Sequence, residues 1–390
     1  MYCREDFASS GLTNYSTHHW RVTAGASLAK APIDNGQSRR YDVASQVMKP
    51  HPNIIKIDPP AGIAGGEVIV HFDRLSAAAL SRLQVRFAGV PAHLVSAKTD
   101  RALALVPEVA SDGAVKVDIV TEAGDPQTGT AAAFTIGTRM AANLHPVTSP
   151  TFDPTDGSLF VTRSGSRGEH APISIFRIGA EGVEEFSGDV TNPTAIAFDR
   201  TRRMFVTSRF DGTVYRFTRD RQVVAFSGDL GIATGMAFNR DGEMFVGDRS
   251  GSIYRVNEIG EAKPWAEHEA SVSAYHLAFG ADDNLYVSGP TVSSFDLITR
   301  FDPDGNASVF YRGLGRPQGL AFDGEGNLYV AAALRGRRGV VKISADGSRA
   351  ELAVAAMNVV GLAFGPQGEM VVATNEAVYS LPLGIKGLLI

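Results

Sequence analysis

One phrase returns six times in the C-terminal two-thirds of the chain, and this repeat constrains the fold more than any other feature. Each copy joins an apolar run that ends in Phe, a turn built on Asp or Gly, and a second run of the Leu-Tyr-Val type. The spacings between the anchoring phenylalanines are 46, 40, 41, 43 and 42 residues, a period that fits four-stranded blades. Alternating apolar residues and frequent turns exclude a helical solenoid of similar period. We therefore predict a six-bladed β-propeller over 138–390, anchored at Phe152, Phe198, Phe238, Phe279, Phe322 and Phe364.

The sixth copy of the repeat is incomplete. It stops after AVYSLPLG, so its fourth strand must come from another part of the chain. The segment 138–146, just ahead of the first blade, and the tail 384–390 are both candidates. Either one would join the two ends of the ring and remove its open edges.

The preceding segment also reads as β-structure. Residues 51–137 hold roughly seven short segments, and apolar residues alternate in them, as in Val68, Val70 and Phe72. This pattern predicts an immunoglobulin-like β-sandwich over 48–137, so the whole fold is expected to be all-β. Residues 1–47 lack periodicity and are expected to form a disordered leader, with Met48 as an alternative start to Met1.

Composition excludes several function classes. The net charge is −5, which does not favour nucleic-acid binding. The one cysteine, Cys3, cannot form an intramolecular disulfide or a cysteine-based metal site. No apolar run is long enough to span a bilayer, and the N-terminus shows no signal-peptide core, so we expect a cytoplasmic protein without a membrane partner.

Strand direction turns the repeat into a map of candidate site residues. The residues that open each inner strand share a face with the loops between second and third strands, where propeller ligands usually lie. We expect the residue four positions before each aromatic to point at the channel mouth. This predicted ring is Thr148, Thr194, Thr234, His276, Gln318 and Val360.

The loops above the ring carry many arginines, a residue type suited to gripping carboxylate or phosphate. Arg316 lies beside Gln318, and further loops hold Arg209, Arg249, Arg335, Arg337 and Arg338. Two aspartates, Asp211 and Asp248, lie in the same loops. These could fix tight turns or pair with the arginines at a solvated rim, and the ring threonines could satisfy local backbone groups. The candidate ligand-binding set is therefore Thr148, Thr194, Thr234, His276, Gln318, Arg316, Arg209, Asp248 and Arg249.

The motifs of 48–137 resemble those of the IPT/TIG family. They include a Pro-rich first turn, Gly65-Gly66 before the second strand, an FAGVPA segment, a Val-Pro pair and a valine-rich strand. The resemblance implies an immunoglobulin-like sandwich. It does not imply one role, because such modules occur in transcription factors, receptors and enzymes.

The propeller repeats resemble the NHL-repeat group, best in GDRSGSIYRV around Asp248, and the gluconolactonase (senescence-marker-protein) group. The second resemblance implies a divalent cation, often calcium, held by Glu, Asn and Asp at the channel ends of inner strands. The matching positions here are Thr148, then His276 or Thr234, then Gln318. No carboxylate remains among them, so calcium would need loop carboxylates such as Asp248 or Asp296.

Two functions follow as hypotheses. The first is a binding propeller for a small, anionic or sugar-derived ligand or for a protein or peptide partner, with no cofactor. The sequence holds no GxSxG, HExxH or phosphate-loop motif. The alternative is a gluconolactonase-like hydrolase of a sugar lactone or sugar acid. In that case His276 would be the catalytic candidate, as base or orienting donor, and Arg316 would hold the anionic group.

Overall fold

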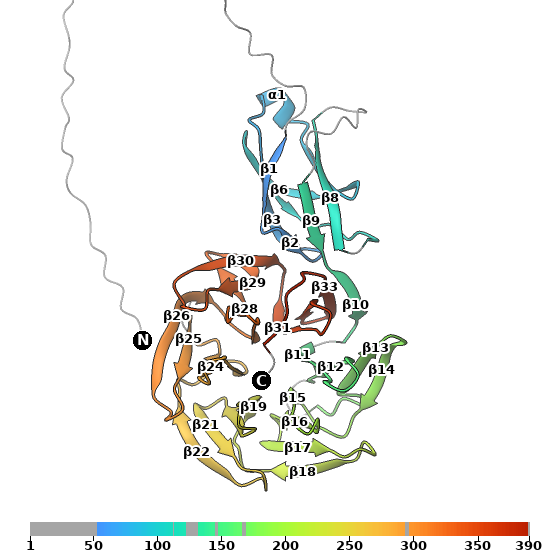
Figure 1. Cartoon of the computed structure of the whole chain (residues 1–390). Helices are drawn as coiled ribbons and strands as arrows, with labels where there is room; N and C mark the ends of the chain where they lie inside the picture. Colours follow the sequence, from blue (N-terminus) through green and yellow to red (C-terminus); the bar gives the residue numbers. More distant parts are fainter. Residues whose placement is uncertain are drawn as a thin grey trace, which may run out of the picture. The chain divides into compact units, whose positions relative to one another are not determined.

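The computed structural model describes residues 53–111, 113–121, 132–144, 147–165, 169–292 and 296–388, and nearly every regular element in them is a strand (Figure 1). The predicted leader and Met48 lie outside the described residues. The one helix within them is the four-residue α1 (Ala77–Leu80). No helix in this part of the chain has the length and apolar character that crossing a membrane requires.

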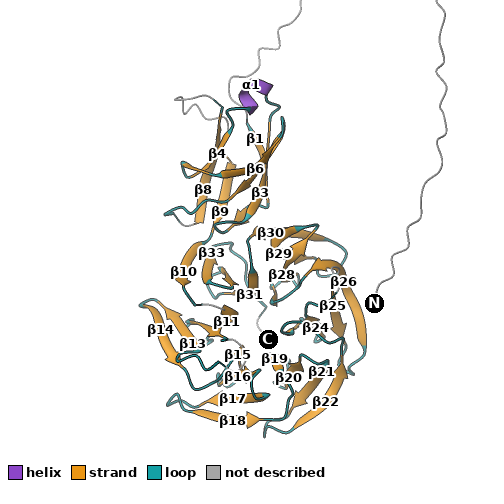
Figure 2. Ribbon diagram, turned by 180° about the vertical axis from the view of Figure 1, so that it is seen from behind, coloured by secondary structure: helices purple, strands orange, loops and turns teal. Residues whose placement is uncertain are grey.

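From β10 onward the described strands form a β-propeller: six four-stranded antiparallel units stand around a common centre (Figures 1 and 2). We number these blades 1 to 6 in chain order. Each of the first five is made from consecutive strands, the innermost first. Blade 1 is β11 (Val147–Phe152), β12 (Leu159–Arg163), β13 (Ile175–Gly179) and β14 (Gly182–Ser187); blade 2 is β15 (Pro193–Phe198), β16 (Met204–Ser208), β17 (Thr213–Phe217) and β18 (Val223–Ser227); blade 3 is β19 (Ala233–Phe238), β20 (Met244–Asp248), β21 (Ser252–Val256) and β22 (Ala262–Glu267). Blade 4 is β23 (His276–Phe279), β24 (Leu285–Ser288), β25 (Asp296–Phe301) and β26 (Ala307–Gly315); blade 5 is β27 (Leu320–Phe322), β28 (Leu328–Leu334), β29 (Arg337–Ile343) and β30 (Ala350–Ala355).

Blade 6 decides between the two candidate closing segments. Its inner strands are β31 (Val359–Phe364), β32 (Met370–Thr374) and β33 (Ala377–Leu381), and its outer strand is β10 (Thr138–Ala142), antiparallel to β33. The segment ahead of blade 1 therefore supplies the missing strand. The tail has another place: the Leu388 N–H donates to the Phe322 carbonyl at 2.9 Å, at the turn end of blade 5.

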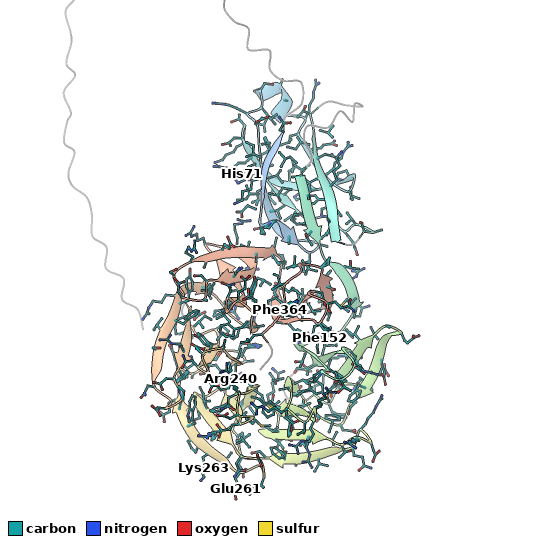
Figure 3. All side chains as sticks on the ribbon, viewed as in Figure 1. His71, Phe152, Arg240, Glu261, Lys263 and Phe364 are labelled. Carbon is teal, nitrogen blue, oxygen red and sulfur yellow. The ribbon has the colours of Figure 1, made fainter. Side chains whose placement is uncertain are left out.

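The repeated aromatics are the contacts between blades. The aromatic of one blade's second strand packs against the anchoring phenylalanine of the next blade, with ring centroids 4.8–5.9 Å apart. Where the ring closes, Val371 of blade 6 takes the aromatic's place in the core that includes Phe152. Figure 3 labels Phe152 and Phe364, on the inner strands β11 and β31 of these two blades. The repeat is thus the signature of the interfaces that hold the ring together.

The residue after the anchoring phenylalanine sets the turn that follows. In blade 2, Asp199 Oδ1 accepts from the N–H groups of Thr201 at 2.9 Å and Arg203 at 2.8 Å. In blade 5, Asp323 accepts from Asn327 in the same way. These side chains satisfy turn amides that the ladder leaves open, which explains the Asp that recurs in the repeat.

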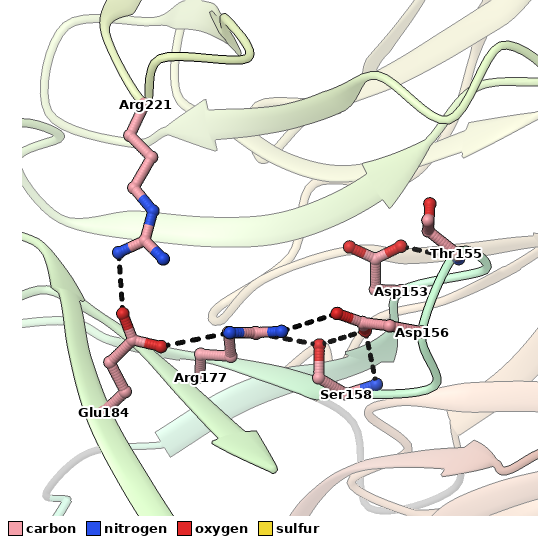
Figure 4. A network of polar contacts seen from close by, with 7 residues as sticks. All are labelled: Asp153, Thr155, Asp156, Ser158, Arg177, Glu184 and Arg221. Carbon is pink, nitrogen blue, oxygen red and sulfur yellow. Dashed lines mark hydrogen bonds and ion pairs between the residues drawn. The ribbon is translucent and has the colours of Figure 1, made fainter.

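A polar network joins blades 1 and 2 on their outer side (Figure 4). Arg221 of blade 2 donates to Glu184 at 2.6 Å, and Glu184 accepts from Arg177 at 3.2 Å. Arg177 also reaches Asp156 at 2.5 Å. Hydrogen bonds from Arg221 and Arg177 lower the pKa of the Glu184 carboxyl. Because these groups are exposed, the network adds little stability and specifies mainly the register between blades.

The N-terminal module has two sheets around one core. The first sheet orders β1 (Ile54–Asp58), β3 (Glu67–Phe72), β7 (Arg101–Leu105) and β6 (His93–Ala97); the second orders β2 (Ala61–Gly62), β9 (Ala132–Ile136), β8 (Gly113–Val120), β4 (Gln84–Phe87) and β5 (Val90–Pro91). Both contribute to the same hydrophobic cluster, in which Val70 of one sheet and Phe87 and Val117 of the other are fully buried. The apolar residues that alternate along the sequence form the inward faces of these strands.

The module is joined to blade 5 by the short strand β2. It pairs in parallel with β9 on one side and with β30, the outer strand of blade 5, on the other. The Ile63 N–H donates to the Ala355 carbonyl at 2.9 Å. Arg337 of blade 5 donates to Asp58 Oδ2 at 2.7 Å. Ala355 is buried in the module's own core, so the two parts share packing as well as backbone bonds.

Candidate functional site

Inner-strand openings and the ends of second strands lie on one face of the propeller. Pro193 pairs with Ser208 in blade 2, Ala233 with Asp248 in blade 3, and His276 with Ser288 in blade 4. We call this side the mouth face. It carries the loops between second and third strands and the loops between blades.

Two of the predicted ring threonines, Thr194 and Thr234, are buried. Thr234 is 1% exposed; its hydroxyl donates to the Gly247 carbonyl and accepts from the Tyr275 N–H, both at 3.1 Å. Thr194 is likewise buried, and the side chain of Thr148 lies outside the described residues. The residues that line the channel follow one or two positions later, among them Ala195 and Met236. The predicted ring is thus displaced, because bulges in β15 and β19 re-aim the strand openings.

His276 does face the channel. It lies three positions before Phe279, not four, and β23 pairs with β24 without a bulge. Tyr275 therefore takes the buried place that Thr234 holds in blade 3. The His276 ring makes no hydrogen bond within the described part of the chain. Burial lowers its pKa to about 4, so the ring is neutral at pH 7 and has a free nitrogen lone pair.

The channel beside His276 is narrow. Its cavity measures about 100 Å³, and Gly235, Gly319 and Gly361 line it beside Leu277. A Cβ on Gly319 would come within 2.6 Å of the Gly361 Cα, so these glycines allow the inner strands to approach closely. His276 is the one titratable side chain among the described lining residues.

A larger cavity opens on the mouth face over blades 4 to 6. We call it the mouth groove; it measures about 760 Å³. Arg316 and Gln318, both predicted site residues, line it together with Arg338. No described lining residue carries a carboxylate. The remaining lining residues are Val272, Thr291, Val292, Gly315, Ala332, Ala333, Gly336, Gly339, Asn358 and Val359.

Arg316 has a left-handed backbone. Its φ is +48°, in a region that residues other than glycine adopt uncommonly but that Arg202, Arg221 and Arg335 of this chain also adopt. It lies six positions before its anchoring phenylalanine, and the matching residues of blades 2 and 6 are Asn192 and Asn358, with φ of +48° and +54°. Asparagine tolerates this conformation better than arginine does. The comparison across blades also identifies Asn358 as a groove residue, which the sequence prediction missed.

The predicted loop residues of blades 2 and 3 lie outside the groove. Asp248 is buried and accepts from the N–H groups of Ile232 at 2.8 Å and Ser250 at 3.1 Å, so it fixes a turn. Arg209 donates to the Gly165 carbonyl at 2.8 Å. Desolvation and the nearby charge of Arg249 lower the pKa of Arg209. Neither Arg209 nor Arg249 forms an ion pair with a described residue. Arg337, by contrast, forms an ion pair with Asp58.

The residues present do not fit a calcium site. Within the described ranges no group of three or more His, Cys, Asp or Glu side chains is placed to hold a metal ion. Asp248 is committed to its turn. Asp296 Oδ1 accepts from the Thr291 N–H at 3.0 Å and its hydroxyl at 2.7 Å. Asp248 and Asp296 Oδ1 therefore hold loops, and the one remaining oxygen, the buried Asp296 Oδ2, is too few ligands for calcium.

No family model matches the chain, and no curated protein matches it. The IPT/TIG and NHL resemblances therefore rest on their motifs.

Solved structures do match the chain. A putative gluconolactonase is 15% identical with a TM-score of 0.54, and the match covers 65% of this chain and 94% of that one. A gluconolactonase of Xanthomonas campestris is 16% identical, with a TM-score of 0.51 and coverage of 63% and 93%. A Bacteroides thetaiotaomicron protein of unknown function is 14% identical, with a TM-score of 0.52 and coverage of 85% and 98%. At these identities the likeness shows the propeller fold and leaves activity open.

Proposed function

We propose that this chain is a ligand-binding β-propeller whose ligand carries an anionic group and lies in the mouth groove. The observation that carries the proposal is the convergence of Arg316, Arg338 and Gln318 on one cavity whose described lining holds no carboxylate. Guanidinium groups bind carboxylate and phosphate strongly when no internal acid competes for them. The volume of about 760 Å³ is in the range of small-molecule sites.

The test is a thermal-shift panel of organic acids, each paired with its neutral amide. We expect at least one acid to raise the melting temperature of the wild-type protein, and its amide to have no effect. The double variant Arg316→Gln, Arg338→Gln should lose this response. If every acid stabilises the wild type and the double variant equally, the groove is not the site and the proposal is wrong.

One observation favours a second candidate, a gluconolactonase-like hydrolase. His276 is neutral and faces the channel without a hydrogen-bond partner among the described residues, as a general base would. The cavity beside His276 is small, about 100 Å³, and the described residues hold no fitting metal site; both findings argue against a hydrolase. Hydrolysis of glucono-δ-lactone by the wild type, with or without added Ca²⁺, and its loss in His276→Gln would establish the enzyme. No rate above the spontaneous one would exclude it for this substrate.

The N-terminal module is proposed to be an IPT/TIG-type sandwich. Its two sheets around a common core support this assignment, as do the motifs from Gly65-Gly66 to Val106-Pro107. A crystal structure of the whole chain with a strand order foreign to immunoglobulin-like folds would refute it.

A further inference from the structure

The walls of the mouth groove are apolar and smooth. Val272 and Val359 line it, together with the small residues Ala332, Ala333 and Gly339. Val272 is 46% exposed, which is a high fraction for a valine next to a concave surface. A ligand that covered these side chains would remove apolar area from water, which favours binding.

The polar groups of the groove are mainly donors. Arg316 and Arg338 donate only, while Gln318, Asn358 and Thr291 have one oxygen each that can accept from a ligand. Several sugar hydroxyls would need acceptors, and no described carboxylate or aromatic ring lines the groove to receive them or to stack on a sugar ring. A polyhydroxylated ligand would therefore leave donors unsatisfied when desolvated.

The position of Arg316 supports the same conclusion. Its left-handed backbone is shared with Arg202, Arg221 and Arg335, but of these four arginines only Arg316 is among the described residues that line the groove. Because Arg316 has no ion-pair partner in the described structure, its guanidinium is available to a ligand anion.

We propose that the ligand is an amphipathic organic acid: one carboxylate held by Arg316 and Arg338, with Gln318 as a further donor, and an aliphatic or aromatic body against Val272 and Val359. This inference rests on the proposed function and narrows it, because it excludes sugar acids as the preferred ligand.

Three six-carbon probes test the chemistry with the full chain: hexanoate, hexanamide and D-gluconate. Dissociation constants are measured by ligand-observed NMR at low and high salt. We expect hexanoate to bind at least about tenfold more tightly than either of the others, since a charged hydrogen-bond pair and apolar burial each contribute. Binding of hexanoate should weaken at high salt, because exposed charges are screened.

Variants locate the site. Arg316→Gln and Arg338→Gln should each raise the dissociation constant for hexanoate about tenfold. Arg312→Gln, an exposed arginine of β26 outside the groove, should leave it unchanged. Gluconate binding that equals or exceeds hexanoate binding and depends on Arg316 would overturn the ligand class while leaving the proposed function intact. Binding of none of the three, or hexanoate binding insensitive to both groove arginines, would overturn both.

Discussion

Arg316 is the residue at which stability and function are expected to oppose each other. Its φ of +48° matches that of Asn192 in blade 2. Arg316→Asn should therefore stabilise the fold by about 0.5–1 kcal/mol, because asparagine tolerates the left-handed region better. For a chain of this size this raises the melting temperature by about 2 °C. The same variant should lose anion binding.

For Arg316→Asn, the melting temperature measured by calorimetry should rise, and the anion affinity measured by titration should fall. Asn358→Ala is the control. It should lower the melting temperature, because it replaces an asparagine, which tolerates the left-handed conformation, with a residue that tolerates it less well. A less stable Arg316→Asn protein would show that the arginine contributes to the fold, contrary to our argument.

His276 makes stability depend on pH. Burial lowers its folded-state pKa to about 4, whereas an unfolded histidine titrates near 6.5. As pH falls below about 6.5, the unfolded chain therefore takes up a proton that the folded chain does not. The free energy of unfolding should decrease down to about pH 4, by on the order of 3 kcal/mol.

Urea denaturation of the wild type and His276→Gln across this pH range measures the effect. Gln does not titrate, so the variant should have a shallower pH dependence between pH 6.5 and 4. His93→Gln, at an exposed position of β6, should follow the wild type. Parallel curves for all three proteins would mean that His276 is hydrated and takes up protons normally.

At the scale of the strand, hydroxyl groups at the ends of second strands tie consecutive blades together. Thr207 of β16 donates to the Thr234 carbonyl of blade 3 at 2.7 Å and accepts from the Ala195 N–H at 2.9 Å. Thr162 reaches the Thr194 carbonyl of blade 2 in the same way, at 3.4 Å. These contacts explain why hydroxyl residues recur after the Phe-Val or Tyr-Val pairs of the repeat.

Thr207→Val should be strongly destabilising for its size. The valine keeps the shape but leaves a buried carbonyl and a buried N–H without partners, at a cost of about 2–4 kcal/mol. Thr138→Val on the exposed edge of β10 should change the free energy of unfolding by less than about 0.5 kcal/mol. Denaturant unfolding measures the stability of both variants. Equal losses of stability would refute the proposed role of Thr207 in joining blades 2 and 3.

At the scale of the whole molecule, Gly66 lies where the module meets blade 5, close to Ala355. A Cβ there would overlap the Ala355 carbonyl of β30. Gly66→Ala should therefore force β2 away from blade 5 and destabilise the chain by about 1–3 kcal/mol. It should also make the connection after β9 easier to cleave in limited proteolysis.

Gly179→Ala is the matched control, because nothing lies within 4 Å of a Cβ at that position. It should change the melting temperature by no more than about 1–2 °C. A Gly66→Ala protein that melts and digests like the wild type would show that the β2–β30 contact is dispensable.

The propeller could be predicted from the amino-acid sequence alone, because the features that specify each blade are local. Alternation along each strand, the aromatic at each blade interface and the Asp of each turn are repeated every 40 to 46 residues, so each copy supports the others. Strand direction follows from the same pattern, which is why Arg316 and Gln318 could be predicted at the mouth of the channel.

The pairing of segments that are remote in sequence became visible only in the folded chain. The segments 138–146 and 384–390 were both acceptable as the last strand, and pairing of β10 with β33 settled the choice. Bulges in β15 and β19 turn Thr194 and Thr234 away from the channel, whereas β23 pairs without a bulge and leaves His276 on it. The mouth groove, too, arises where three blades come together, and no single repeat contains enough of it to reveal it.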